Sequence, residues 1–189
     1  TVYAKKRGME DFSTEEVTAL QLLQGRGVFG IEMRIVDENN TELPWDGVAS
    51  GALKVRGPWV AKGYFGLSDT PGHEDCPVDE SGWFNTGDVA AITPEGFLQI
   101  TDRTKDVIKS GGEWISSIEI ENAAVNHPDI AEAAVIGRFH PKWTERPLLI
   151  AVAQPGRSLL KSDVLDFLMD KLHKMALPDD VVFIDELPH

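Results

Sequence analysis

The segment DRTKDVIKSGGEWIS, residues 102–116, divides the sequence into two parts with different patterns. Before it, short apolar runs alternate with polar residues and are separated by glycine and proline, which is typical of β-strands joined by turns. After it, amphipathic helical patterns alternate with dense apolar runs. We therefore expect an α+β fold, in which a β-rich part at residues 1–101 is followed by a small mixed α/β part at residues 102–189.

One short helix and a series of strands are predicted for the first part. The helix covers residues 14–24, a periodic apolar pattern that begins with acidic residues suited to a first helical turn. In the run GALKVRG, the apolar Leu53 and Val55 alternate with basic residues, so one face of that strand is expected to be buried. The predicted strands cover residues 31–36, 51–57, 89–92 and 97–100.

Helices and strands are mixed in the second part. Ser116 and Glu119 form a capping box for a helix at residues 117–126, which ends before Pro128. Ser162 is predicted to cap a second helix. The apolar face of this second helix is expected to hold Val164, Phe167, Leu168 and Leu172. The predicted strands cover residues 130–137, 148–154 and 181–185.

Composition narrows the class of function. The chain has 189 residues, with 18 basic and 31 acidic side chains and a formal net charge of −13. This charge repels nucleic acid but permits a local basic pocket for a small phosphorylated ligand. The single cysteine, Cys76, fits a reducing compartment, and neither a signal peptide nor a membrane-spanning run is found, so we expect a cytoplasmic protein. Histidines lack metal-ligand spacing, so no protein-bound transition metal is expected.

The sequence GRGVFG, residues 25–30, matches a dinucleotide-binding fingerprint letter by letter. That fingerprint needs a strand before the glycines and a helix after them, so that the helix N-terminus meets a pyrophosphate. Here a helical pattern precedes the glycines and a strand follows them. We therefore interpret this segment as a glycine-rich turn.

The segment GWFNTGDV, residues 82–89, places Asp88 directly after a glycine and before a strand-like run. A carboxylate has two acceptor oxygens, so it can accept hydrogen bonds from both hydroxyls of a vicinal diol such as ribose. From this segment alone, a carboxylate that caps a turn is the favoured alternative.

The basic residues of the opening segment suggest a second candidate site. Arg103 offers a rigid fork of donors, whereas Lys105 and Lys109 offer mobile point charges. If residues 106–109 are extended, both lysines share one face and could reach the same phosphate or carboxylate. Gly111 and Gly112 would allow a sharp turn or a close approach of a ligand to the backbone. A solvated charged strand and its turn is an equally good interpretation.

Taken together, the motifs resemble those of the AMP-forming acyl-CoA synthetases, in the adenylate-forming ligase superfamily. The resemblance rests on RGPWVAKGYF (56–65), GWFNTGDVA (82–90), DRTKDVIKSGGEWIS (102–116) and EIENAAVNHPDIAEAAVIG (119–137), in the order and spacing of the family. The segment KSGGEWIS is most similar to the branch acting on medium- and long-chain fatty acids. These enzymes couple a carboxylate to ATP as an acyl-adenylate, then transfer the acyl group to CoA.

The resemblance implies a role for each candidate residue. Asp88 and Arg103 would contact the ribose of ATP or AMP, and Lys105 would be the hinge between two domains. Lys109 would be catalytic in the thioester-forming step. Ser110, Gly111 and Gly112 would lie on the loop that binds the pantetheine arm of CoA.

The resemblance also implies a domain organisation and a limit to activity. Residues 1–101 would be the last, β-rich subdomain of the large adenylating domain, and residues 102–189 the small mobile C-terminal domain, truncated before its adenylation lysine. The phosphate-binding loop and the magnesium ligand of the family lie in the N-terminal part, which we expect to be missing. The chain also starts without methionine. We therefore expect it to be a fragment that is inactive on its own.

Alternatives to an acyl-CoA ligase remain open at this point. One is an adenylation domain that loads the phosphopantetheine of a carrier protein, and another is a luciferase-like enzyme that oxidises its adenylate. A third, from another class, is a non-catalytic module that binds nucleotide. The acidic surface and KSGGEWIS favour CoA as the acceptor, with the carboxylic acid, ATP and CoA as small-molecule partners.

Overall fold

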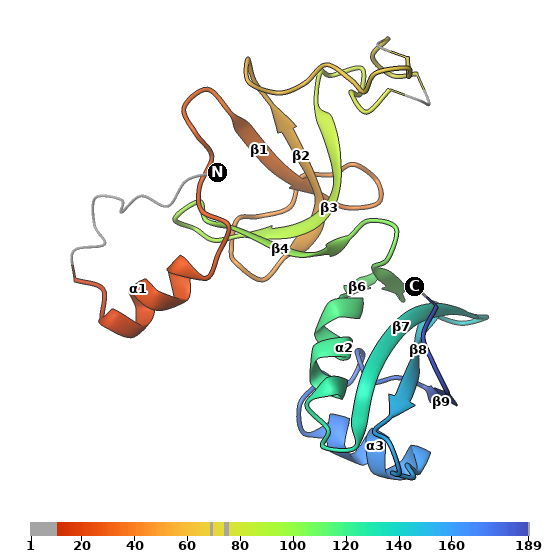
Figure 1. The fold of residues 1–189 in the computed structure, drawn as a ribbon. Coiled ribbons are helices and arrows are strands. Elements are labelled where there is room, and N and C mark those ends of the chain that lie inside the picture. Colours follow the sequence, from red (N-terminus) through yellow and green to blue (C-terminus); the bar gives the residue numbers. More distant parts are fainter. Residues whose placement is uncertain (1–10, 69, 74–75, 189) are drawn as a thin grey trace. The chain divides into compact units, whose positions relative to one another are not determined.

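The computed structural model of the chain describes residues 11–68, 70–73 and 76–188. The chain divides into two compact units, Thr1–Thr104 and Lys105–His189 (Figure 1). The boundary predicted after residue 101 lies slightly earlier, within the last strand of the first unit. The elements found bear out the expected α+β class, with helices and antiparallel sheets.

The first unit consists of a short helix followed by an antiparallel sheet with strand order β1-β2-β3-β4. The elements are α1 (Thr14–Gln21), β1 (Glu32–Val36), β2 (Ser50–Arg56), β3 (Phe84–Ile92) and β4 (Leu98–Arg103). Ser13 caps α1 through a reciprocal pair of hydrogen bonds with Glu16. The helix ends earlier than predicted because the backbone N–H of Gln24 donates to the carbonyl of Leu98, which ties the chain to β4.

The core of the first unit lies on one face of this sheet. Ile35, Leu53, Ala90, Ile92 and Leu98 are all buried there. This burial confirms the inward direction predicted for Leu53. Burying such side chains stabilises the sheet by about 1.5–3 kcal/mol for each large aliphatic residue. The glycine-rich segment 25–30 is a turn between α1 and β1, as predicted.

Strand β3 is longer than the predicted strand at residues 89–92. It begins at Phe84, because Phe84 and Asn85 pair with Val55 and Lys54 of β2. Asp88 therefore lies inside a strand rather than in the turn before it.

The second unit contains a sheet with strand order β6-β5-β8-β7, and β9 also pairs with β8. The elements are β5 (Ile108–Ser110), β6 (Glu113–Ile115), α2 (Ser117–Val125), β7 (Ile130–His140), β8 (Thr144–Ala153), α3 (Lys161–Met169) and β9 (Asp180–Ile184). Strand β7 pairs antiparallel with β8 along its whole length. Residues 148–152 of β8 pair in parallel with β9, and Thr144 pairs with β5.

Helices α2 and α3 pack on the second sheet and bury a shared apolar core. Ile120 and Ala124 of α2, and Val164 and Leu168 of α3, are fully buried in it. Ser116 caps α2, since its hydroxyl accepts the N–H of Glu119 at 3.2 Å, as predicted. The predicted apolar face of α3 is confirmed for Val164, Phe167 and Leu168, whereas Leu172 contacts the same core from beyond the end of the helix.

Two sequence predictions in the second unit are wrong. Leu160, not Ser162, is the N-cap of α3, and the Ser162 hydroxyl instead bonds to the carboxylate of Asp163. The neighbouring Leu159 packs against the core, and this contact starts the helix two residues earlier than a cap at Ser162 would.

Residues 106–109 do not form one extended strand, because 104–107 are a turn and β5 begins at Ile108. Val107 and Ile108 are both buried, at 6% and 0% exposure, whereas adjacent residues of a strand point to opposite faces. Lys105 and Lys109 therefore do not share a strand face.

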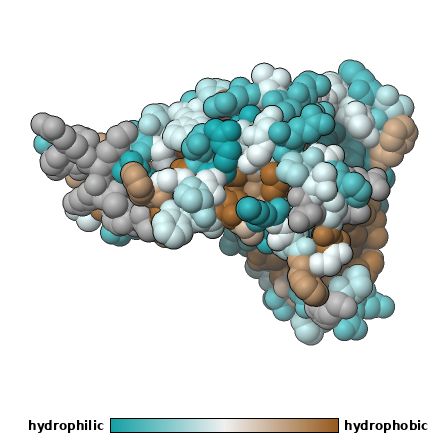
Figure 2. Space-filling view, turned by 90° about the horizontal axis from the view of Figure 1, so that it is seen from above, coloured by the Kyte–Doolittle hydropathy of each residue, from teal (hydrophilic) through white to brown (hydrophobic). Residues whose placement is uncertain are grey.

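Large apolar side chains also reach the surface, where apolar areas lie between hydrophilic ones (Figure 2). In the first unit, Phe29 and Trp59 are 98% and 73% exposed. In the second unit, Phe139 is 78% exposed. Contiguous exposed apolar surface commonly marks a contact with another part of a protein. None of the helices described here is long and apolar enough to cross a membrane.

Candidate functional site

Asp88 and Arg103 are brought together by the pairing of β3 with β4. They are register partners on these antiparallel strands. The Nη1 atom of Arg103 lies 2.8 Å from Oδ1 of Asp88. The Asp88 side chain is 17% exposed and that of Arg103 is 60% exposed, so the pair is open to solvent on its arginine side.

The backbone around Asp88 is fixed by its neighbours. Gly87 has a φ of +77°, which favours glycine, and its carbonyl accepts the N–H of Thr104 at 2.8 Å. The N–H of Asp88 donates to the Thr86 hydroxyl at 3.1 Å. Arg103, the register partner of Asp88, is the last residue of β4. The Asp88 carboxylate and the Arg103 guanidinium therefore present hydrogen-bond acceptors and donors side by side, and the hydroxyls of a ribose could bind to them.

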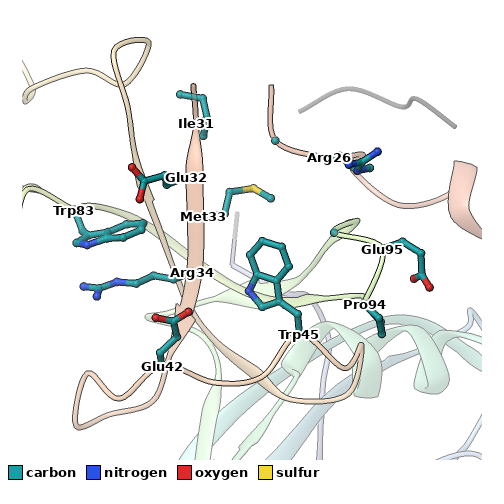
Figure 3. A pocket seen from close by; sticks show the side chains of 12 residues that line it. Arg26, Ile31, Glu32, Met33, Arg34, Glu42, Trp45, Trp83, Pro94 and Glu95 are labelled. Carbon is teal, nitrogen blue, oxygen red and sulfur yellow. The ribbon is translucent and has the colours of Figure 1, made fainter. Parts of the chain in front are cut away.

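The start of β3 is anchored by Trp83, which lies between two guanidinium groups. Its ring centroid is 4.3 Å from the Cζ atom of Arg34 and 4.5 Å from that of Arg56. Figure 3 shows the ring of Trp83 over the Arg34 side chain. Such cation–π contacts contribute about 0.5–2 kcal/mol each. Trp83 is 9% exposed and therefore holds the segment that leads to Asp88.

Asp79 completes this anchor. Its carboxylate accepts a hydrogen bond from Lys54 Nζ at 2.8 Å and one from the Trp83 N–H at 3.0 Å. Burial would by itself raise the pKa of Asp79, but the hydrogen bonds from Lys54 and from the Trp83 backbone outweigh it and lower the pKa. The carboxylate is therefore ionised throughout the neutral range.

A pocket of about 460 Å³ lies beside Trp83 (Figure 3). Its walls carry side chains of both charges together with Trp45 and Trp83. The lining includes none of the residues that the sequence predicts for ATP or CoA. The pocket is therefore a feature separate from the Asp88–Arg103 pair.

Lys105 is the first residue of the second unit. It is exposed and lies on the turn at residues 104–107, between β4 and β5. A turn between two compact units is the place where a few residues can absorb a rotation of one unit.

Lys109 lies in β5 and is the register partner of Trp114 in β6. Its Nζ atom is 5.2 Å from the centroid of the Trp114 ring, within the range of a cation–π contact. Its backbone N–H donates to Oε2 of Glu145 at 2.9 Å. The side chain is half-buried, so its charge is held close to the strand.

Gly111 and Gly112 form the turn of the β5–β6 hairpin. Their φ values are +61° and +88°, as required at both central residues of a type I′ turn. A Cβ atom on Gly111 would lie 2.7 Å from Cε3 of Trp143, whereas one on Gly112 would meet no described atom within 4 Å. The hairpin therefore packs closely on Trp143 at one residue and is open at the next.

The side chain of Ser110 is fully buried rather than exposed on this loop. Its hydroxyl accepts a hydrogen bond from Nη1 of Arg146 at 3.3 Å. Contact of this residue with a ligand would therefore involve the backbone or a rearrangement of the side chain.

Sequence reasoning missed Glu145 and Arg146, which contact Lys109 and Ser110. The strand was predicted to start at Leu148, but β8 starts at Thr144. Charged residues such as Glu145 and Arg146 are usually exposed. The one sequence signal for the burial of Arg146 was its position just before the apolar run at residues 148–154. As for metals, no group of three or more acidic, histidine or cysteine side chains that could hold an ion occurs among the described residues.

Comparisons with known proteins identify relatives over most of the chain. Residues 119–189 match the family of the AMP-binding enzyme C-terminal domain. The chain is 52% identical, over 92% of its length, to a 3-methylmercaptopropionyl-CoA ligase of Ruegeria lacuscaerulensis, of which it covers 31%. It is 47% identical, over 94% of its length, to a medium-chain-fatty-acid–CoA ligase of Ectopseudomonas oleovorans, of which it covers 32%. The chain thus spans about a third of the length of these relatives.

A solved structure has the same fold. It is an o-succinylbenzoate CoA synthetase from Bacillus subtilis, in complex with its acyl-adenylate intermediate. The TM-score is 0.74 at 29% identity, over 93% of this chain and 34% of the other.

Proposed function

Because the chain belongs to the adenylate-forming ligase superfamily, in its branch of AMP-forming acyl-CoA ligases, we propose that it is part of an enzyme that joins a carboxylic acid to CoA. In the first half-reaction, a carboxylate oxygen attacks the α-phosphorus of ATP, and pyrophosphate leaves. In the second, the sulfur of CoA attacks the acyl carbon, its thiol proton is released, and AMP leaves.

The ion pair between Asp88 and Arg103 is the observation that carries this proposal. Asp88 accepts hydrogen bonds from the ribose hydroxyls, and the guanidinium of Arg103 orients the carboxylate while offering further donors to the nucleotide. The 2.8 Å contact and the exposure of Arg103 support this role, because the fold itself holds the two groups together and leaves the pair accessible. Preformed donors and acceptors reduce the cost of ordering on binding.

The second unit supplies groups for the acyl transfer. Lys105 is the hinge, and its position on an exposed turn at the boundary of the units supports this assignment. Lys109 stabilises the charge that develops on AMP as it leaves. The backbone of residues 110–112 contacts the pantetheine arm of CoA, and the open side of Gly112 leaves room for it. In this proposal the first unit is the last subdomain of the large adenylating domain, and the second unit is the small mobile domain.

Magnesium and the phosphates of ATP are assigned to other parts of such a ligase. The described residues do not fit a metal ion, since they contain no suitable cluster of ligands. No step assigned to this chain depends on one.

The proposed substrate is a medium- or long-chain fatty acid, and the proposed location is the cytoplasm. The 47% identical relative, which is a medium-chain-fatty-acid–CoA ligase, supports the chain length. The 52% identical relative is a 3-methylmercaptopropionyl-CoA ligase, so 3-methylmercaptopropionate must be tested beside the fatty acids. The single cysteine fits a reducing compartment.

The test uses the full-length enzyme that contains this chain. Acyl-CoA formation is measured with octanoate, palmitate and 3-methylmercaptopropionate, with either CoA or a phosphopantetheinylated carrier protein as acceptor. We expect ATP-dependent acyl-CoA and AMP formation with a fatty acid and free CoA. Transfer to the carrier protein alone, or AMP binding without turnover, would contradict the proposal. The 189-residue chain alone should show no ATP–pyrophosphate exchange.

A further inference from the structure

Strand β5, which carries Lys109 and Ser110, is weakly attached to the sheet by its backbone. Among the described residues, β5 and β8 pair at one register position, Ser110 with Thr144. Strand β9 pairs with the same strand further along, from Leu148 to Val152. A short strand with little backbone pairing has few hydrogen bonds to fix its position. The hairpin turn adds one backbone bond, from the N–H of Gly111 to the carbonyl of Trp143 at 2.9 Å. Side-chain contacts must therefore contribute to where the rest of β5 lies.

Two consecutive side chains of β8 make these contacts. Oε2 of Glu145 accepts the backbone N–H of Lys109 at 2.9 Å, a bond that a neighbouring strand would otherwise provide. Nη1 of Arg146 donates to the hydroxyl of Ser110 at 3.3 Å. Each of the two residues of β5 that precede the glycine turn is thus held by a charged side chain. Hydrogen bonds to charged groups are stronger than those between neutral ones.

Arg146 is itself held rigidly. It is 8% exposed, and Nε lies 2.8 Å from Oδ1 of Asp179. Its Nη1 donates to the carbonyl of Met175 at 2.7 Å, and Nη2 to that of Leu177 at 2.9 Å. The guanidinium therefore connects the hairpin to the segment before β9. Its planar group with five N–H donors can bond to several acceptors at once.

Gly137 leaves space for the Glu145 carboxylate. A Cβ atom at this exposed position of β7 would lie 2.9 Å from Oε2 of Glu145, the same oxygen that accepts the Lys109 N–H. Substitution by alanine would displace that oxygen and weaken its hold on the hairpin, while the hairpin residues and Arg146 themselves stay unsubstituted. Gly137 has no positive φ, so alanine would not strain the backbone there.

We propose that Glu145 and Arg146 are positioning residues for acyl transfer to CoA, which they serve by holding Lys109 and the Gly111–Gly112 turn in register. This inference rests on the proposed function, because it assigns the hairpin to the second half-reaction. Because the proposed function assigns no group of the hairpin to adenylation, that step should be insensitive to these two side chains. Misplacement of a reacting group by about 1 Å can slow a step up to ~100-fold.

The experiment compares the two half-reactions in the full-length enzyme. Variants E145A, E145Q, R146M and G137A are assayed for ATP–pyrophosphate exchange and for single-turnover transfer of purified acyl-AMP to CoA. We expect E145A, R146M and G137A to slow transfer by about ten-fold or more, with exchange changed less than about two-fold. E145Q retains an acceptor oxygen and should keep most of the transfer rate.

Arg138 provides a matched control. It is the register partner of Arg146 on β7, but its side chain is 50% exposed. R138M should leave both half-reactions unchanged. Because R146M removes a buried charge and could unfold the domain, the variants G137A, at an exposed position, and E145A, at a half-buried one, provide the independent test. Thermal midpoints are measured for all variants.

The outcomes separate the two proposals. Equal loss of both half-reactions, or no loss in either one, would overturn the positioning role while leaving the ligase activity standing. A parent enzyme that forms no acyl-CoA would overturn both.

Discussion

Arg103 and Asp88 face each other across strands β3 and β4, with 2.8 Å between Nη1 and Oδ1. The arginine side chain is 60% exposed, and exposed ion pairs contribute about 0.2–1 kcal/mol to stability. The fold therefore depends little on this pair. Its effect is to fix the direction of the carboxylate, which is what recognition of a ribose diol would require.

The first prediction concerns ATP affinity. D88A in the full-length enzyme should weaken ATP binding by about ten-fold, the loss expected from one charged hydrogen-bonding group. The measurement is calorimetric titration with ATP, and the thermal midpoint should change little. E32Q is the control, because it removes another exposed ion pair of the same sheet, that of Glu32 with Arg56. Unchanged ATP affinity in D88A would contradict the ribose role.

The second prediction concerns the hinge. Proline at position 105 fixes φ near −65° and restricts Thr104 as well, so the turn at 104–107 loses freedom. K105P should spare acyl-AMP formation and depress acyl-CoA formation, measured as separate half-reactions. K105A removes the charge but keeps the backbone freedom, and should behave like the parent. If K105A and K105P are equally impaired, the side chain matters and the hinge assignment is wrong.

Much of the fold could be predicted from local patterns. The helix capped by Ser116 and the apolar face containing Val164 and Leu168 follow from capping and periodicity, which act within a few residues. The misplaced cap at Ser162 shows the limit of such rules, since tertiary packing of Leu159 decides where α3 begins.

The candidate site depended more on long-range contacts. That Asp88 and Arg103 meet follows from strand register, which the sequence does not specify. Arg146 was missed because its partners Ser110 and Asp179 are far apart in sequence. The extended interpretation of residues 106–109 failed because Val107 and Ile108 are both buried.

The third prediction separates the two glycines of the hairpin turn. G112A meets only the backbone strain of a positive φ, about 1–2 kcal/mol. G111A adds an overlap with the Trp143 ring and should cost about 1–3 kcal/mol more. Chemical denaturation of the chain measures both. In a W143A background, the difference in unfolding free energy between G111A and G112A should become smaller. If that difference stays the same, the Trp143 ring is not its cause.

The last prediction concerns the pH dependence of stability through Asp79. Its pKa in the folded protein is lowered, chiefly because the hydrogen bonds from Lys54 and the Trp83 N–H overcome the opposing effect of burial. A lowered pKa means that the native state favours the ionised form more than the unfolded state does. The stabilisation is therefore complete above the unfolded pKa, near 3.9, and is lost as pH falls through the lower folded pKa.

D79N should accordingly reduce the free energy of unfolding by about 1–3 kcal/mol at pH 7, because it leaves Lys54 without its ionic partner. The difference between D79N and the parent should shrink as the pH falls below about 3.9 and through the lowered pKa of Asp79 in the folded protein. Urea denaturation at a series of pH values measures it. In a K54M background the effect of D79N should be smaller at pH 7, since the main charged partner is gone. A difference that is absent at pH 7, or that does not shrink at any pH below about 3.9 at which the parent remains folded, would mean that the charge of Asp79 does not stabilise the anchor around Trp83.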